Sequence, residues 1–156
     1  MNGCSPMKKT LFWIVSNIAF GLYRRLPIFG ELRASVGVLE REGQYLVIQR
    51  NDGRGLSFPG GTAWPFEPET TTLVREVQEE TGLTTGKHEL LFCYSSDIDA
   101  PCRITVFRIE ASGSLRESWE GVPRWVGANE LRARVARSQL PIVERLLETP
   151  NAPSQA

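Results

Sequence analysis

Hydrophobic and polar positions alternate with a period of two along residues 34–39, whose sequence is ASVGVL. This alternation is typical of a half-buried strand. A second apolar run, YLVI at residues 45–48, follows the turn-forming sequence REG at residues 41–43. The pattern therefore predicts two strands separated by a turn.

Two later segments predict a hairpin. Residues 89–95 and 103–109 are predicted strands, and the turn-rich sequence DIDAP lies between them at residues 97–101. Trp125 and Val126 mark a further short strand.

The spacing of apolar residues changes to a helical period after residue 67. Proline suits the first turn of a helix, so Pro68 predicts its beginning, and Gly82 predicts its end after Thr81. A helical turn is also expected at residues 129–131, and a C-terminal helix from about Pro141. At about 100° per residue, the apolar side of the first helix comprises Leu73, Val74, Val77 and Thr81.

The polar side of the helix at residues 68–81 carries glutamates that repel one another. Glu76 and Glu80 lie one turn apart, and Glu79 lies beside them. Like charges at these spacings cost about a few tenths of a kcal/mol each on an open helix. Arg75 lies one turn before Glu79 and neutralises only part of this charge. We therefore expect a cation to bind over the rest.

Carboxylate oxygens are hard ligands, which suit Mg²⁺ or Mn²⁺ better than zinc. The chain has one histidine, His88, and three scattered cysteines, Cys4, Cys93 and Cys102. The sequence therefore does not assemble a zinc site. The alternative to a metal site is an ordinary solvated helix face of glutamate and arginine.

Residues 61–83 follow the pattern G-x5-E-x7-R-E-V-x-E-E-x-G-L. This pattern resembles the signature of the Nudix (MutT-like) pyrophosphohydrolases, with no position missing. The Gly60-Gly61 turn, Glu67 and Arg75 all fit the signature together. So many fixed positions favour the family over a solvated helix face.

The resemblance implies an α/β fold, the Nudix α/β/α sandwich with a mixed central sheet. We expect the Nudix hydrolase domain at residues 33–149 and a disordered tail at residues 150–156. Residues 1–32 lie outside the resemblance and are expected to form an N-terminal helical extension outside the core fold.

The resemblance also implies roles for the residues at matching positions. Gly60 would bring a backbone carbonyl to the metal. Arg75 would orient the glutamates through charge-assisted hydrogen bonds, and Glu67 would support the site from the loop. The metal-binding carboxylates would be Glu76, Glu79 and Glu80.

Many family members use a further carboxylate on a loop before a Trp-containing strand. Glu120 lies in that place in the sequence SWEGVPRWV, and Glu117 is the fallback. An ordinary loop acid is the alternative interpretation of either residue. The sequence does not decide which carboxylate acts as the general base.

Three other residues are candidates for substrate binding. Arg50 ends a segment that resembles the family's second strand, and it would face substrate phosphates; a surface arginine at a strand end is the alternative. Trp64 and Phe66 lie in the loop before the helix, near where a base or sugar would rest. Packing anchors are the alternative interpretation of these aromatic residues.

The implied reaction is attack of a metal-activated water on a phosphorus of a diphosphate linkage. The expected substrate is a nucleoside diphosphate linked to another group, as in an NTP, a nucleotide sugar or ADP-ribose. One alternative is a nucleotide-binding sensor without turnover, but such proteins tend to lose the motif glutamates. Another is an isoprenoid diphosphate isomerase, but the sequence offers no cysteine–histidine pair for that reaction.

Length and charge agree with a small substrate. The 156 residues suit one domain, and 18 basic side chains balance 18 acidic ones. Dedicated nucleic-acid binders usually show a basic excess, so we expect no such binding. The few, irregularly spaced cysteines indicate a reducing, cytoplasmic compartment.

Residues 8–25, KKTLFWIVSNIAFGLYRR, form an apolar stretch flanked by basic residues. The stretch is shorter than the roughly twenty apolar residues that span a bilayer, and no signal-peptide cleavage site follows it. We expect a helix that docks on its own domain or on a partner subunit in a homodimer. The alternative is peripheral contact with a membrane surface through residues 10–25.

Overall fold

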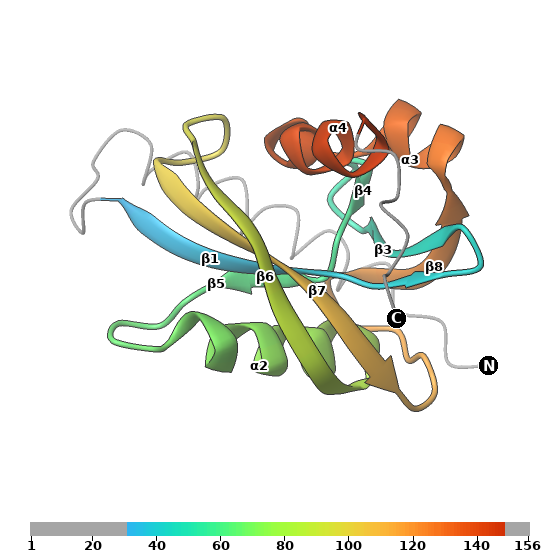
Figure 1. Cartoon of the computed structure of the whole chain (residues 1–156), viewed down its shortest axis with the longest axis horizontal. Helices are drawn as coiled ribbons and strands as arrows, with labels where there is room; N and C mark the ends of the chain where they lie inside the picture. The colour runs from blue at the N-terminus through green and yellow to red at the C-terminus, as the bar shows by residue number, and fades with distance from the viewer. Residues whose placement is uncertain (1–30, 149–156) are drawn as a thin grey trace, which may run out of the picture.

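The computed structural model describes residues 31–148, in which two four-stranded sheets lie between helices (Figure 1). In the first sheet β1 runs parallel to β7, whereas the other neighbours are antiparallel. The sheet is therefore mixed, as predicted. Its strands, in spatial order, are β5 (Gly60–Thr62), β1 (Leu32–Val38), β7 (Cys102–Ser112) and β6 (Thr84–Ser96).

The second sheet is antiparallel and is built around β3, which pairs with each of its neighbours. Its strands are β2 (Glu40–Arg41), β3 (Gln44–Arg50), β4 (Leu56–Ser57) and β8 (Gly121–Gly127). The central layer is thus divided into two sheets, a detail that the strand pattern alone did not predict.

Helices cover the sheets from two sides, which gives the α/β/α arrangement (Figure 1). On one side lies α2, and on the other lie α3 and α4. The helical segments are α2 (Glu69–Thr81), α3 (Ala128–Arg134), the short 3₁₀ helix η1 (Arg137–Gln139) and α4 (Leu140–Glu148). The predicted α/β fold class and the three helical regions are confirmed.

The ends of α2 are those that the sequence predicted. Pro68 is the N-cap, and Gly82 ends the helix in the left-handed conformation with φ of 76°. Leu73, Val77 and Thr81 are buried. Val74 is 39% exposed, so its predicted burial was wrong, because the sheet covers a narrower arc of the helix than the apolar pattern suggested.

The hydrophobic core has two parts, one on each side of the sheets. One part lies beneath α2, where Leu73 and Val77 pack with Leu46, Phe107 and Ile109. Full burial of such side chains contributes about 1.5–3 kcal/mol each. The other part includes Phe58 and Val106 from the strands and Ile142 and Val143 from α4.

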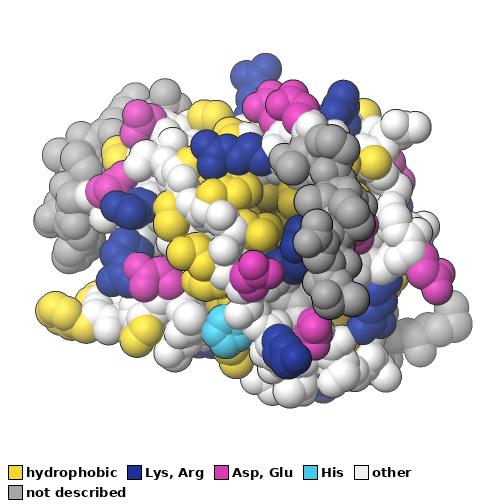
Figure 2. Space-filling view, in the orientation of Figure 1, with side chains coloured by type: hydrophobic (Ala, Val, Ile, Leu, Met, Phe, Trp, Pro, Cys, Tyr) yellow, Lys and Arg dark blue, Asp and Glu magenta, His cyan; other side chains and the backbone are white. Residues whose placement is uncertain are grey.

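The predicted hairpin is present, but its strands are longer than expected. β6 and β7 pair from Thr84–Ser112 to Ser96–Cys102. As an edge strand, β6 has many exposed residues, which weakened the apolar signal. Figure 2 shows hydrophobic side chains gathered in the middle of the face that β6 crosses, and Leu90 on this strand is 56% exposed.

Residues 1–30 of the predicted N-terminal helical extension and the whole predicted C-terminal tail lie outside the described residues, whereas Leu32 begins β1. Within residues 31–148, no helix is long and apolar enough to cross a membrane.

Candidate functional site

The Gly60-Gly61 turn lies directly against α2, and this approach requires glycine. A Cβ atom on Gly61 would lie 2.6 Å from Oε1 of Glu76. Gly60 has a φ of 152°, and a Cβ there would overlap the carbonyl of Ser35 on β1. The amide of Gly60 donates a hydrogen bond to Oε2 of Glu80 at 2.8 Å. The two glycines thus place backbone beside two carboxylates.

Arg75 connects the loop to the glutamates of the helix. Its Nε and Nη2 donate to the two carboxylate oxygens of Glu67, each at 3.0 Å. Its Nη1 donates to Oε1 of Glu76 at 2.7 Å and to Oε2 of Glu79 at 3.4 Å. Its Nη2 also reaches the carbonyl of Thr62 at 3.2 Å. One guanidinium therefore fixes three carboxylates.

Glu67 is held by donors from three residues. Besides Arg75, the amide of Trp64 and the hydroxyl of Thr72 donate to its Oε2, each at 2.9 Å. These bonds, those from Arg75 foremost, lower the pKa of Glu67 to about 2. Glu67 is therefore ionised at neutral pH, and both of its carboxylate oxygens accept hydrogen bonds within the protein. This arrangement fits the role expected from the motif, in which Glu67 supports the site from the loop.

Glu76 and Glu80 are buried carboxylates on the side of α2 that faces the turn, with 9% and 4% exposure. Burial raises the pKa of Glu76. Burial and the neighbouring Glu120 raise the pKa of Glu80 well above its usual value. Glu120 therefore lies close enough to Glu80 for its charge to act there, so tertiary structure brings this loop acid to the helix.

Glu79 and Glu117, the other two acids singled out in the sequence, are exposed. Glu117 is exposed on the loop before β8. The side chain of Glu79 is 60% exposed and pairs only with Arg75 among the ion pairs of residues 31–148. Across those residues, no group of three acid, cysteine or histidine side chains is arranged to hold a metal ion as it stands.

Arg50 lies at the end of β3 with its guanidinium close enough to Glu80 and Glu120 to feel their charges. Burial acts to lower the pKa of Arg50, but the hydrogen bonds and charge of Asp52, together with the charges of Glu80 and Glu120, outweigh that effect and raise it. Sequence reasoning missed Asp52, since a lone acid in the turn NDGRG carries no recognisable pattern.

Arg50 also lines a cavity of about 130 Å³ beside the Gly60-Gly61 turn. Apolar and polar residues both line this cavity. The apolar ones include Leu32, Ala34, Val36 and Ile104, and the polar ones include Ser96, Asp99, Ser138 and Gln139. Such a lining suits a flat ring with polar edges.

Trp64 and Phe66 do not line that cavity. They line a separate hollow of about 400 Å³ with residues 31–33. Trp64 is 67% exposed and Phe66 is 99% exposed, so neither is a packing anchor. The guanidinium carbon of Arg75 lies 5.8 Å from the Trp64 ring centroid, so the ring lies beside the arginine that contacts the glutamates.

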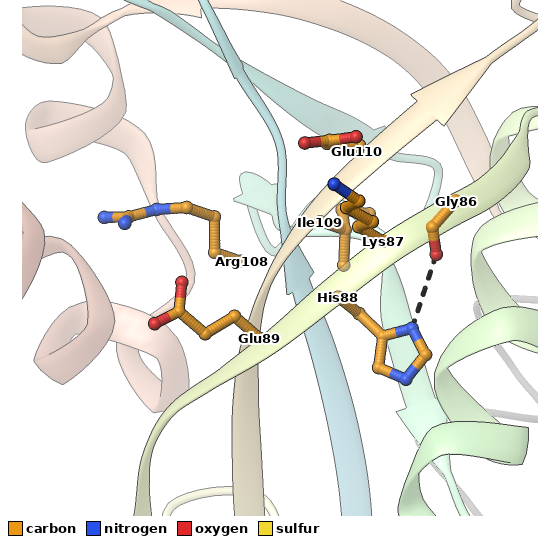
Figure 3. Close-up of a pocket in the computed structure, with 7 residues that line it drawn as sticks. All are labelled: Gly86, Lys87, His88, Glu89, Arg108, Ile109 and Glu110. Carbon is orange, nitrogen blue, oxygen red and sulfur yellow. Dashed lines mark hydrogen bonds between the residues drawn. The ribbon is translucent and has the colours of Figure 1, made fainter. Parts of the chain in front are cut away.

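A larger hollow, of about 580 Å³, lies on β6 and β7 away from these residues (Figure 3). Acidic and basic side chains alternate around it, and the His88 ring points to Gly86, with Nδ1 3.4 Å from its carbonyl oxygen. It contains neither the glycine turn nor the α2 glutamates, so its size does not make it the candidate site. Its lining is Gly86, Lys87, His88, Glu89, Arg108, Ile109 and Glu110.

The glycine turn, Arg75 and the buried glutamates of α2 thus lie together in the structure. Residues 31–146 match the sequence profile of the NUDIX domain. The chain therefore belongs to the Nudix family, as the motif indicated.

Individual relatives agree with this assignment. A MutT-like protein of Streptomyces ambofaciens is 35% identical over 103 residues, which cover 64% of this chain and 66% of that protein. The chain thus spans just under two thirds of that relative's length.

Solved structures share the fold at lower identity. The solution structure of the E. coli ORF135 protein has a TM-score of 0.67 and 23% identity, covering 84% of this chain and 99% of that one. The MutT NUDIX hydrolase of Burkholderia pseudomallei has a TM-score of 0.67 and 19% identity, covering 74% and 98%.

Proposed function

We propose that this protein is a metal-dependent pyrophosphohydrolase that cleaves a nucleoside diphosphate linked to another moiety. Nudix proteins are generally pyrophosphohydrolases acting on phosphoric anhydride bonds, and membership of the family supports hydrolysis. The observation that carries the proposal is the burial of Glu76 and Glu80 beside Glu120 and the Gly60-Gly61 turn. A sensor without turnover is not favoured, because every motif glutamate is present.

The donor set fits a hard divalent cation. Glu120 makes the ionisation of Glu76 and of Glu80 more costly, and a cation would relieve that cost. We assign Mg²⁺ or Mn²⁺ to these carboxylates, with Glu79 and the carbonyl of Gly60 as further ligands. When bound, the cation would activate a water and neutralise charge on the phosphates.

The remaining residues would act by positioning. Arg75 would keep Glu76 and Glu79 oriented, and Glu67 would keep Arg75 in place through their paired hydrogen bonds. Arg50 would contact the phosphate chain from the mouth of the adjoining cavity, which would receive the base or sugar. Trp64 and Phe66 are exposed, and they would contact a part of the substrate that projects outward from the site.

The proposed function is tested by determining which phosphate bond of the substrate the protein cleaves. A cation held by several glutamates binds best to two adjacent phosphates, so linked diphosphates should be cleaved to a nucleoside monophosphate and the remaining half. Nucleoside monophosphates and p-nitrophenyl phosphate should be poor substrates.

A screen of NTPs, nucleotide sugars and ADP-ribose with Mg²⁺ and with Mn²⁺ should identify the substrate. Reaction in ¹⁸O-water, followed by mass spectrometry of both products, then shows which phosphorus receives the new oxygen. Rapid release of phosphate from simple monoesters, with linked diphosphates left intact, would overturn the proposal.

A further inference from the structure

Asp52 is a fully buried carboxylate next to the candidate site, and neither the motif nor the proposed chemistry uses it. It lies in the turn between β3 and β4, two residues after Arg50, and its side chain has no exposed surface. A charged side chain is rarely buried so completely unless it is paired. Its partners therefore indicate what it does.

The principal partner of Asp52 is Arg50. Nε of Arg50 donates to Oδ1 and Oδ2 of Asp52 at 2.9 and 3.1 Å, and Nη2 donates to Oδ2. The amide of Arg54 donates to Oδ1 at 3.1 Å. Burial acts to raise the pKa of Asp52, but the hydrogen bonds and charges of Arg50 and Arg54 together outweigh it and lower the pKa. The pair is thus ionised at neutral pH.

This pairing uses only one edge of the Arg50 guanidinium. Nε and Nη2 face Asp52, whereas Nη1 has no hydrogen-bond partner among residues 31–148. Arg50 also lines the cavity that contains Gly60 and Gly61. Nη1 is therefore open, and the Arg50 side chain lies beside the glycine turn and near the charges of Glu80 and Glu120.

Without a fixed partner, an arginine at this position could instead pair with the neighbouring glutamates. Its charge interacts with Glu80 and Glu120, and direct pairing with them would occupy the carboxylates that are proposed to hold the cation. A paired carboxylate on the opposite side restrains the arginine and reduces the entropy lost when it binds an anion.

We propose that Asp52 is a positioning residue that holds Arg50 with one guanidinium edge directed at the phosphate chain of the substrate. The inference rests on the proposed pyrophosphohydrolase function, which it deepens. Asp52 itself does not touch the substrate. Asp52 also accepts a hydrogen bond from the Arg54 amide. The simpler alternative is therefore that Asp52 only stabilises the turn between β3 and β4.

The substitution Asp52→Asn separates the two roles. Asparagine keeps the size of the side chain and an oxygen that accepts from the Arg54 amide, but its amide group cannot replace the two-point pairing with Arg50. We would compare the wild type with D52N, R50A and the double variant. Glu130→Gln is the matched control, because Glu130 pairs with Arg124 and Arg134 outside the site.

Two measurements apply to each variant. The first is the split between KM and kcat on a substrate found in the screen. The second is calorimetric binding of methylenediphosphonate with Mg²⁺, whose P–C–P bridge cannot be hydrolysed. This second measurement reports the phosphate site even if the proposed hydrolysis is wrong.

D52N and R50A should each weaken methylenediphosphonate binding and raise KM on the order of tenfold, with a smaller change in kcat. The double variant should be no weaker than R50A, because Asp52 acts only through Arg50. E130Q should bind as the wild type does. The inference is overturned if D52N lowers the melting temperature but binds normally, or if its effect persists in full in the R50A background.

Discussion

Arg75 and Glu67, which lie eight residues apart on opposite sides of the start of α2, form a two-point pair with both N–O distances at 3.0 Å. Glu67 belongs to the loop and Arg75 to the helix, so the pair fixes the loop to the first turns of α2. Because the same guanidinium contacts Glu76, the position of the loop and the orientation of a site carboxylate depend on one side chain.

The low pKa of Glu67 makes its contribution to stability dependent on pH. A carboxyl whose folded pKa is about 2, against an ordinary value of 4.5, stabilises the fold fully above pH 4.5 and loses that contribution as pH falls to 2. Glu67→Gln should therefore be less stable than the wild type at pH 6 and nearly equal to it at pH 2. Urea unfolding across this range measures the difference. A stability difference that did not shrink on acidification would contradict the ionised pair.

Glu80→Gln should abolish most activity without unfolding the protein. Loss of one cation ligand removes part of a stabilisation worth several kcal/mol, so kcat should fall roughly 100-fold or more. The apo protein should melt at a higher temperature, because a buried carboxylate with a raised pKa opposes folding at neutral pH. Steady-state kinetics and calorimetry measure both effects.

Glu117→Gln is the control for this variant, since Glu117 is exposed on the same loop as Glu120. It should keep wild-type turnover. Full activity of Glu80→Gln with Mg²⁺ would contradict the assignment of α2 as the metal site.

Addition of Mg²⁺ should stabilise the wild type against heat. A ligand that binds only the folded state adds about 2.7 kcal/mol at a concentration of 100 times its Kd. Glu80→Gln should show a smaller shift in melting temperature over the same titration. An equal shift in both proteins would mean that the cation binds elsewhere.

Gly61→Ala should disturb the site more than the fold. The added methyl would fall on the carboxylate of Glu76, which could move away only by losing its 2.7 Å bond from Arg75. Activity should fall, and stability should decrease by about 1–3 kcal/mol. Thermal unfolding and kinetics on the same preparation measure the two effects.

Gly86→Ala is the matched control, because a Cβ there meets its nearest atom, the carbonyl oxygen of Glu110, at 3.5 Å. It should change stability by no more than about 0.5 kcal/mol. Equal losses in the two variants would show that the Gly61 effect is not specific to Glu76.

The sequence by itself determined the features that depend on short-range spacing. The bounds of α2 follow from Pro68 and Gly82, and the adjacency of Glu76 and Glu80 follows from the helical period. The hairpin of β6 and β7 and the strand β3 were predicted in place. Their full lengths were not, because edge strands expose one side and lose the apolar alternation.

Only the tertiary structure decided which distant residues join the helix. Glu120 approaches Glu80 because β8 pairs with β3 and brings its preceding loop to the glycine turn. The same sheet places Arg50 at the cavity and buries Asp52 behind it, whereas Trp64 and Phe66 point to a different hollow. Local sequence encodes the spacing of neighbours along one element. Contacts between elements depend on strand pairing and packing, which no single segment specifies.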